Sequence, residues 1–387
     1  MLSRFPSLAC VLLLFMALVA QAQPEPAPII AWVRGDLWRL DPVEIDAASR
    51  QLTRGGAISG YALSPDGRAI AFKAAAQVGL DALDQIQAAG LIAEFDLPAD
   101  IYLLDAATGQ IALVAGQPDD ASLLAADRPD RALVRSAPVW SPDGLRIAWT
   151  ELDFSVSVSP PPRLVVYDLA TRTAYRAIDS IPAAITFGAA PPLIWGTSAV
   201  AVSAGVAADG ALQFLFFRLN ADRPAELLAV ARVPSPNAET QEIAWVEDEG
   251  EGLLGILLTT GHWILIDPRT GNIQPAEATP LLYSTAAGGS SLGLRFGALP
   301  QTGMFWETVE LGGATAASAA YVGTPGRVAL SPDGREVAFL GFPTYATVAI
   351  WEAGGLLPLP ATGEGEDRLE VGSLIWGPMA WRLGPRP

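Results

Sequence analysis

The chain has 387 residues, of which 51% are hydrophobic and 17% charged, and its formal net charge is −17. This length and apolar fraction are enough for a large core in one or two domains, while so acidic a surface would repel phosphate backbones and argues against nucleic-acid binding. The 37 glycines and 32 prolines separate many short apolar runs, which favours an all-β protein over a helical one.

The first 22 residues predict a signal peptide. Arg4 precedes an apolar run over residues 8–20, and a small-x-small site ends at Ala22, where we expect cleavage. A proline-rich leader would follow at 23–28. An uncleaved anchor is the alternative, although the run is short for a membrane span. The signal peptide predicts a periplasmic or extracellular protein. Cys10 is the only cysteine and lies in this segment, so the mature chain would have no disulfide, which fits a bacterial exported protein.

One eleven-residue phrase occurs three times, as ALSPDGRAIAF, VWSPDGLRIAW and ALSPDGREVAF. Proline presets φ, aspartate bonds back to the backbone and glycine takes a left-handed conformation, so Ser-Pro-Asp-Gly predicts a hairpin turn between two apolar strands. The predicted structural turn residues are Ser64, Pro65, Asp66, Gly67, Ser141, Pro142, Asp143, Gly144, Ser331, Pro332, Asp333 and Gly334. Aspartates that recur around a repeat cannot all meet at one site, so we interpret them as structural.

A second phrase follows downstream, as IYLLDAAT, VVYDLAT and ILIDPRT, each an apolar strand ending in Asp-x-x-Thr. The unit is therefore four antiparallel strands. Weaker first strands are expected at 193–195, 243–245, 281–284 and 374–376. Together with the three clear copies they make seven, and later copies lie roughly 40 to 55 residues apart, a period typical of β-propeller blades.

We therefore predict an all-β fold, a β-propeller of seven four-stranded antiparallel blades, with six or eight as alternatives because the middle copies are weak. The strands expected at 29–33, 37–41 and 50–53 lack a preceding first strand, whereas SLIWGPMAWRL follows the last blade. The two ends of the chain should thus share one blade and close the ring. Residues 29–387 would form a single propeller domain.

The repeat resembles that of the TolB-like, WD-repeat-like β-propellers of bacteria. The likeness depends on SPDG followed by IAF, IAW or VAF, and on the IYLLD phrase; it is strong over about 57–115, 131–180 and 326–362 and weak over 185–325. It implies the propeller fold, but such propellers serve as protein-docking platforms, sugar binders and enzyme lids. The expected organisation leaves no room for the N-terminal α/β domain of TolB.

An insertion at 74–98 interrupts the second predicted blade. Its apolar residues recur at helical spacing between polar ones, which predicts an amphipathic helix. The helix would either pack on its own propeller or dock a partner. The candidate partner-binding residues are Leu80, Leu83, Ile86 and Leu91.

No catalytic set emerges from the sequence. His262 is the only histidine and is interpreted as structural, and without a mature cysteine it cannot build a zinc or copper site. The G-x-S-x-G match at 289–293 lacks a strand–turn–helix context and a later histidine. We predict no cofactor: calcium could use acidic loops at 119–120, 247–251 or 364–367, but none has an EF-hand pattern. Paired carboxylates for glycoside chemistry stay an open alternative.

We therefore expect an exported, non-catalytic β-propeller that acts as a protein-binding or scaffold module in the cell envelope. Its partner would be an unidentified envelope protein, and the chain would be a monomer or part of a complex, without a stable membrane span after signal cleavage. The alternative is a carbohydrate- or peptide-binding protein, or a hydrolase, that uses the mouth of the propeller channel. A structural component of a surface assembly is a third reading.

Overall fold

The computed structural model describes residues 28–383 with gaps. The residues outside the description are 1–27, 41–49, 89–95, 125–129, 158, 183–188, 208, 221–224, 235–239, 249–250, 259–261, 279, 286–291, 300–302, 311–327, 335, 341–347, 353–354, 359–370 and 384–387. The predicted signal peptide and most of the predicted leader therefore lie outside the described residues.

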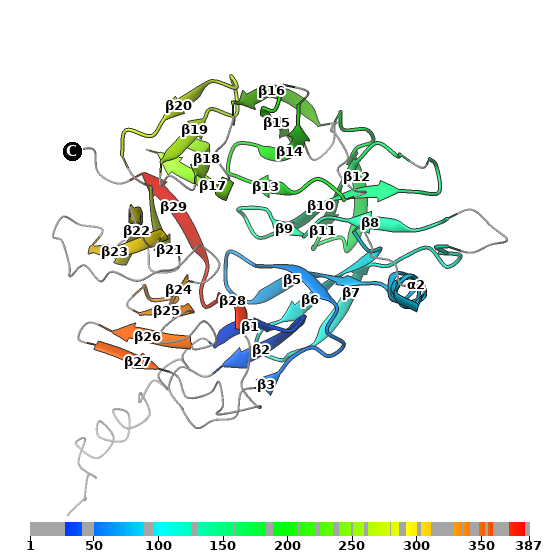
Figure 1. Ribbon diagram of the computed structural model, residues 1–387, viewed down its shortest axis with the longest axis horizontal. Coiled ribbons are helices and arrows are strands. Elements are labelled where there is room, and N and C mark those ends of the chain that lie inside the picture. The colour runs from blue at the N-terminus through cyan, green and yellow to red at the C-terminus, as the bar shows by residue number, and fades with distance from the viewer. Residues whose placement is uncertain are drawn as a thin grey trace, which may run out of the picture.

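The described strands form six sheets that follow one another around a ring (Figure 1). The first sheet has the order β28 (Val371–Ile375), β1 (Ile29–Val33), β2 (Asp36–Leu40) and β3 (Arg50–Gln51). The second consists of β4 (Ile58–Leu63), β5 (Ala69–Ala75), β6 (Ala99–Asp105) and β7 (Ile111–Ala115). The third has the order β12 (Thr173–Ile178), β11 (Arg163–Asp168), β10 (Arg146–Asp153) and β8 (Leu133–Arg135), with β9 (Val139–Trp140) also paired to β10.

The remaining sheets complete the ring. The fourth consists of β13 (Leu193–Trp195), β14 (Val200–Val206), β15 (Leu212–Arg218) and β16 (Glu226–Val233). The fifth has eight strands, in the order β20 (Ile273–Pro275), β19 (Trp263–Ile266), β18 (Glu251–Leu258), β17 (Thr240–Asp248), β29 (Met379–Leu383), β21 (Pro280–Ser284), β22 (Leu292–Leu299) and β23 (Gly303–Glu310). The sixth consists of β24 (Val328–Leu330), β25 (Val337–Leu340), β26 (Val348–Glu352) and β27 (Gly355–Pro358).

The core of the molecule lies between neighbouring sheets. Each of the larger hydrophobic clusters takes its residues from two consecutive sheets: Leu37 packs in one cluster with Phe72, and Ile101 packs in the next with Trp149. Further clusters join the third sheet to the fourth, the fourth to the fifth and the fifth to the sixth. The last cluster joins the sixth sheet back to the first, so the sheets form a closed ring, which defines a β-propeller.

The prediction of seven separate four-stranded blades is wrong. Five sheets are of blade size, with four or five strands each, and the remaining strands form one eight-stranded sheet. The cause is β29, which pairs in parallel with β17 and antiparallel with β21 and so fuses the strands on its two sides into one sheet. The structure thus has five separate blades.

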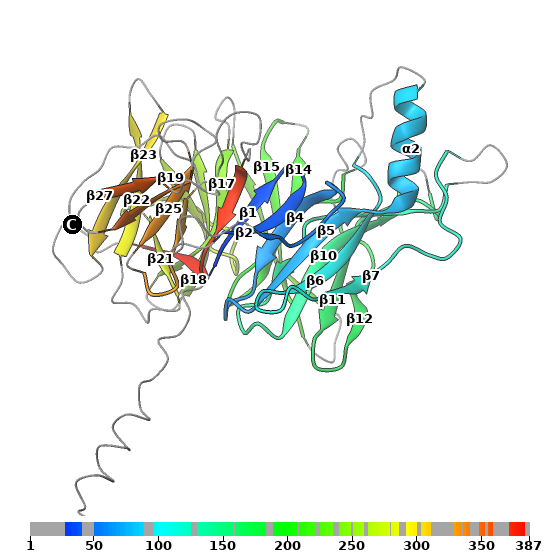
Figure 2. The same ribbon diagram turned by 90° about the horizontal axis from the view of Figure 1, so that it is seen from below.

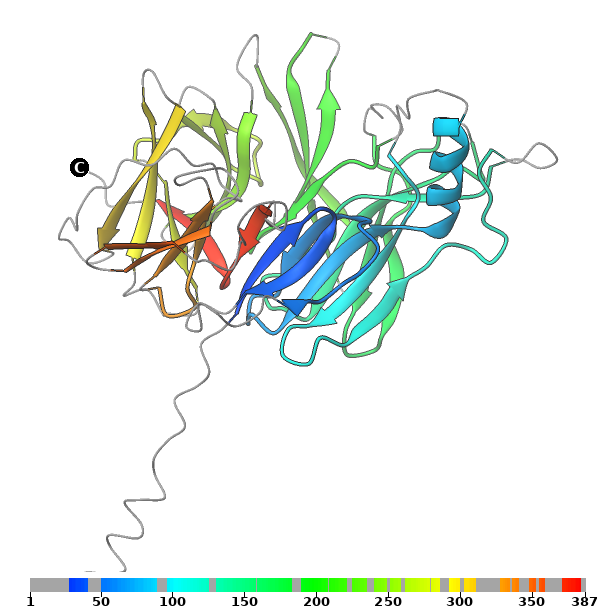
Figure 3. The same cartoon turned by 60° about the horizontal axis from the view of Figure 1, so that its bottom comes forward.

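The two ends of the described chain meet in the first sheet. β28 pairs antiparallel with β1, with Trp32 opposite Ser373, and Figure 3 shows the red β28 beside the blue β1. The C-terminal residues do not all enter this sheet as expected, because β29 continues into the eight-stranded sheet. A hydrogen bond between the hydroxyl groups of Tyr61 and Ser373 also ties β28 to the second sheet.

The insertion in the second blade contains the helix α2 (Gln77–Ala88), which projects from one end of the ring between β5 and β6 (Figure 2). Gly79, Ala82 and Ile86 are buried, whereas Asp81 and Asp84 are exposed. The helix is therefore amphipathic and packs on its own propeller through its apolar side. Within the described ranges, no helix is long and apolar enough to cross a membrane.

Candidate functional site

The Ser-Pro-Asp-Gly segments form tight turns between β4 and β5, between β9 and β10, and between β24 and β25. The Ser64 hydroxyl donates to Oδ1 of Asp66 over 2.6 Å and accepts from the amide of Ala69 over 2.9 Å, while the amide of Arg68 donates to Asp66 over 3.1 Å. Gly67 has a φ of 73°, in the left-handed region that glycine adopts without steric cost. These bonds join residues at most five positions apart, so the turn is held by its own sequence.

The other two turns repeat this geometry. The Ser141 hydroxyl donates to Asp143 over 2.5 Å and the Ser331 hydroxyl donates to Asp333 over 2.6 Å. Gly144 and Gly334 have φ values of 70° and 68°. The three aspartates thus accept hydrogen bonds inside three different sheets and are not brought together at one site.

The carboxylates of Asp66 and Asp143 are held in the ionised form. Burial by itself would raise the pKa of Asp66, but the hydrogen bonds from Ser64 and Arg68 outweigh it and lower the pKa below its usual value; the pKa of Asp143 is lowered by the same balance. At the Asp-x-x-Thr turns, the amide of Thr108 is the main cause that lowers the pKa of Asp105. A general acid needs a raised pKa, so these carboxyl groups suit structural acceptors better than proton donors.

A cavity of about 400 Å³ lies beneath α2, where the helix meets the first two sheets. Apolar side chains make most of its walls: Trp32 from β1, Ile58 from β4, Leu80 and Leu83 from α2, and Leu97 before β6. Its volume is within the range of small-molecule sites. Two of the predicted partner-binding leucines, Leu80 and Leu83, are therefore half-buried and line this cavity.

The cavity also holds an ion pair. Lys73, on β5, is 7% exposed, and its Nζ lies 2.6 Å from Oδ2 of Asp96. Both residues line the cavity. Lys73 is the only lysine in the chain. It interrupts the apolar run of β5, and this interruption is the sequence signal that could have indicated a buried charge here. Lys73 comes before α2 in the sequence and its partner Asp96 comes after it, so no local sequence pattern could indicate this ion pair.

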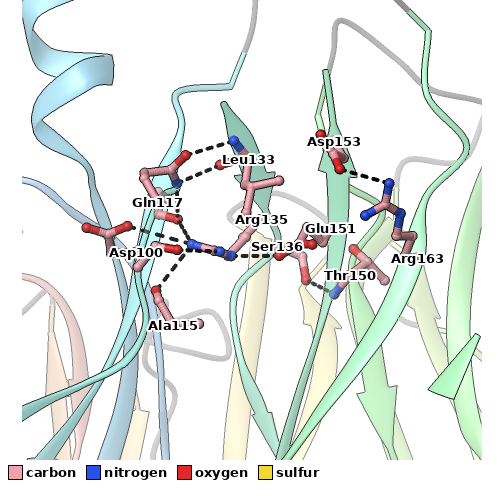
Figure 4. Close-up of polar contacts among 12 residues, drawn as sticks. Asp100, Ala115, Gln117, Leu133, Arg135, Ser136, Thr150, Glu151, Asp153 and Arg163 are labelled. Carbon is pink, nitrogen blue, oxygen red and sulfur yellow. Dashed lines mark hydrogen bonds and ion pairs between the residues drawn. The ribbon is translucent and has the colours of Figure 1, made fainter. Parts of the chain in front are cut away.

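A buried arginine joins the second and third sheets (Figure 4). The side chain of Arg135 is 2% exposed, and its Nε donates to Glu151 over 3.0 Å. Its other nitrogens donate to the carbonyl groups of Ala99, Ala115 and Gly116 over 2.7, 3.2 and 2.9 Å. Because the guanidinium is paired with a carboxylate and occupied by strand-end carbonyls, its role is structural.

A second cavity, of about 440 Å³, lies between the third and fourth sheets beside the Ser141–Gly144 turn. It is more polar than the first. Its lining includes Asp143, Arg146, Arg218 and Trp195. Arg218 also pairs with Glu226 over 2.9 Å at the surface.

Of the other residues singled out in the sequence, those that the structure describes do not line these cavities. Ile86 is 8% exposed and packs on its own chain, and Leu91 lies outside the described residues. His262 is exposed just before β19. The G-x-S-x-G match lies largely outside the described residues, since 286–291 are not described.

Acidic residues of these segments that the structure describes take part in ion pairs and hydrogen bonds. Asp120 pairs with Arg131, and Glu247 accepts a hydrogen bond from the Tyr283 hydroxyl over 2.9 Å. The loop at 364–367 is outside the described residues. In the part of the chain that the structure describes, no three His, Cys, Asp or Glu residues gather in a way that could hold a metal ion.

Fold and cavities together define a β-propeller with an inserted helix over a small apolar cavity. No family model and no curated protein matches the chain. Among solved structures it is similar to TolB from Acinetobacter baumannii, at 15% identity and a TM-score of 0.39, covering 95% of this chain and 69% of TolB.

Two further solved structures are similar. One is the periplasmic gluconolactonase PpgL of Pseudomonas aeruginosa, at 15% identity and a TM-score of 0.46, covering 93% of this chain and 99% of that one. The other is the β-propeller domain of Cps50 (Swd1) from Myceliophteria thermophila, at 14% identity and a TM-score of 0.41, covering 84% of this chain and 91% of that one. At these identities the likeness concerns the fold alone.

Proposed function

We propose that the chain is an exported, non-catalytic β-propeller that binds a protein of the cell envelope through the end of the ring that bears α2. The observation that carries this proposal is α2 itself. A blade needs only a short link between its second and third strands, as between β14 and β15, yet here a helix of 12 residues occupies that link. The helix projects from the ring (Figure 2), and Asp81 and Asp84 lie on its exposed side.

The turn carboxylates suit a structural role better than a role as proton donors. The pKa values of Asp66, Asp143 and Asp105 are lowered because hydrogen bonds hold the ionised form in turns. Such groups accept hydrogen bonds well and donate protons poorly.

A matched pair of charge reversals tests the docking surface. Asp84→Arg changes the exposed side of α2, and Asp179→Arg makes the same change at an exposed position after β12. Immobilised protein is incubated with an envelope extract, and captured proteins are quantified by mass spectrometry. We expect one envelope protein that the wild type and Asp179→Arg retain equally and that Asp84→Arg retains about tenfold less. Equal retention of every captured protein by both variants would remove α2 as the docking surface.

Export has its own test. Expression of the full chain in a bacterium, followed by fractionation and N-terminal sequencing, should give a periplasmic or secreted protein that begins at Gln23. A product that keeps Arg4 and stays in the membrane fraction would favour the anchored form.

The second cavity favours one alternative, the binding of a polar ligand such as a sugar between the third and fourth sheets. Arg218 and Arg232 provide a matched pair, because both form exposed ion pairs on the fourth sheet and only Arg218 lines the cavity. A glycan that raises the melting temperature of the wild type and of Arg232→Ala, but not of Arg218→Ala, would support this alternative. A glycan screen without any such shift would count against it.

A further inference from the structure

We propose that the cavity between the third and fourth sheets binds one neutral pyranose ring, which packs on Trp195 and whose hydroxyl groups bond to Arg146 and Thr197. The proposal rests on the alternative function given above, ligand binding at this cavity, and names the ligand class and the groups that recognise it. It is independent of protein docking at α2.

The cavity lies where the repeat of the hairpin turns is broken. In the third sheet, six residues (141–146) lie between the paired residues nearest the turn, and they begin with Ser-Pro-Asp-Gly. In the fourth sheet, only four residues (196–199) lie between the corresponding pair, with the sequence Gly-Thr-Ser-Ala. The turn of the fourth sheet is therefore two residues shorter and has no proline.

The shorter turn leaves space that is filled between the preceding sheets. Pro65 of the second sheet lies against Gly144 of the third, where a Cβ would be 3.5 Å from Cδ of the proline. The corresponding proline of the third sheet, Pro142, instead lines the cavity of about 440 Å³, opposite residues 196–199 of the fourth sheet. A cavity of this size at one position of a repeat is within the range of small-molecule sites.

Both walls of this cavity are fixed without a ligand. One wall is the turn at 141–144, which its own hydrogen bonds hold. In the other wall, the amide of Gly196 donates to the carbonyl of Ala199 over 2.9 Å. The ring of Trp245 lies directly against Gly196, since a Cβ there would be 1.8 Å from Cε2 of the indole. A preformed cavity avoids the ordering cost that a collapsed one would add to binding.

The cavity offers polar groups that can bond to a ligand. Among the described residues, the guanidinium of Arg146 and the hydroxyls of Thr197 and Ser198 line the cavity and have no hydrogen-bond partner. The hydrogen bonds that hold the turn go to Oδ1 of Asp143, so its Oδ2 can accept from a ligand. A guanidinium only donates, a carboxylate only accepts and a hydroxyl does both, and this mixture matches sugar hydroxyls, which also do both.

Trp195 supplies an apolar surface beside these groups. It is half-buried and lines the cavity. A pyranose ring exposes C–H groups on its faces, and covering one face with an indole removes apolar surface from water. An open-chain polyol has the same hydroxyl groups but no rigid apolar face, and it would lose internal rotations on binding.

The charges around Arg146 favour a neutral ligand. Burial would raise the pKa of Asp143, but a hydrogen bond from Ser141 and the charge of Arg146 help to lower it below its usual value. The pKa of Asp168 is lowered mainly by the amide of Thr171, and the charge of Arg146 adds to this effect. Two ionised carboxylates thus already interact with Arg146, and they would repel an anion. A neutral hydroxyl group can accept from the guanidinium without disturbing this balance.

A panel of methyl pyranosides tests the ligand class. The glucoside, galactoside, mannoside and N-acetylglucosaminide are each titrated into the purified protein by calorimetry. We expect at least one of them to bind with a dissociation constant of about 1 mM or below. Sorbitol should bind at least tenfold more weakly than that pyranoside, and the corresponding uronate should bind no more tightly. In saturation-transfer NMR, the C–H protons on one face of the sugar should receive most of the transfer.

Matched variants test the recognition groups. Arg146→Met should weaken binding of the pyranoside at least tenfold and Thr197→Val about fivefold, because each removes a hydrogen bond to the ligand. Arg176→Met and Thr173→Val are the controls, since they change exposed residues of β12 that do not line the cavity, and they should bind as the wild type does. Trp195→Leu should abolish the preference of the saturation transfer for one face of the sugar.

Four outcomes would overturn the proposal. Absence of binding by the whole panel at millimolar concentration would exclude a pyranose site. Sorbitol equal to the best pyranoside would exclude recognition of the ring, and a uronate that binds at least tenfold more tightly would make this an anion site. If Arg218→Ala lost binding while Arg146→Met and Thr197→Val kept it, a polar ligand would still bind at the cavity, but not through the groups assigned to it.

Discussion

Pro65 of one Ser-Pro-Asp-Gly turn lies against Gly144 of the next: a Cβ built on Gly144 would be 3.5 Å from Cδ of Pro65. Pro378 lies in the same way against Gly67, also at 3.5 Å, and Pro332 lies against Gly377. These contacts therefore connect the sixth sheet to the first, the first sheet to the second, and the second sheet to the third. The turns that mark the blades in the sequence are also where consecutive blades touch.

The first prediction concerns the space at these contacts. Gly144→Ala should lower the free energy of unfolding by about 1 kcal/mol, because its φ of 70° disfavours a Cβ while Pro65 remains at ordinary contact distance. Gly210→Ala is the control, with a φ of 82° and no neighbour within 4 Å, and should cost the same. Gly377→Ala should cost about 2 kcal/mol or more, because its Cβ would lie 3.0 Å from the backbone of Pro332. Urea denaturation measures all three, and a Gly377→Ala loss no larger than that of Gly210→Ala would contradict the tight contact.

The second prediction concerns acid stability. The folded-state pKa values of Asp66 and Asp143 lie below their ordinary values because turn hydrogen bonds outweigh burial. A depressed folded-state pKa stabilises the protein above the unfolded pKa, near 4, and this contribution is lost as the pH falls through the folded value. Asp66→Ala/Asp143→Ala should therefore show a smaller drop in the free energy of unfolding between about pH 5 and pH 2 than the wild type. Asp179→Ala, which removes an exposed carboxyl after β12, is the control and should show the same drop in the free energy of unfolding as the wild type. The prediction would be contradicted if the Asp66→Ala/Asp143→Ala variant also showed the wild-type drop.

The third prediction concerns one turn aspartate at neutral pH. Asp66→Ala should lower the free energy of unfolding by about 1 kcal/mol, because Asp66 would no longer accept from Ser64 and Arg68. Capture of any envelope partner should be unchanged, since α2 lies at the opposite end of β5. Lost capture with an unchanged melting temperature would mean that Asp66 takes part in binding.

The fourth prediction concerns the buried arginine. Arg135→Met should lower the free energy of unfolding by about 3 kcal/mol or more, because it leaves Glu151 buried without its cation. Adding Glu151→Met should recover part of the loss. Recovery should stay incomplete, since the carbonyls of Ala99 and Gly116 also lose a donor. A double variant as stable as the wild type in urea denaturation would show that these carbonyl contacts contribute nothing.

The fifth prediction concerns β29. A chain ending at Pro378 would expose the edges of β17 and β21, with which β29 pairs. We expect a lower melting temperature and self-association in light scattering, because unpaired strand edges add strands from other molecules. A chain ending at Leu383, which keeps β29, should behave as the full-length protein does. Equal behaviour of the two truncated chains would show that β29 is dispensable.

The sequence alone predicted the features whose causes are local. The turn at Ser64–Gly67 is held by hydrogen bonds that span at most five residues. The sequence Ser-Pro-Asp-Gly therefore identifies such a turn wherever it recurs. The helix α2 falls inside the predicted insertion because the spacing of Leu80, Leu83 and Ile86 reports one face of a helix. The all-β propeller class followed from the repetition of such units.

Only the tertiary structure decided the features that depend on residues far apart in the chain. β29 pairs with β17 across more than 130 residues, and this pairing, which no local pattern encodes, reduced seven expected blades to five and an eight-stranded sheet. The cavity beneath α2 likewise needs β1, β5 and α2 together before Lys73 meets Asp96 beside Trp32. The hydrogen bonds of a turn join residues that are close in the sequence, so the turn can be predicted from the sequence alone. Strand pairing and cavity walls instead result from the packing of the whole ring.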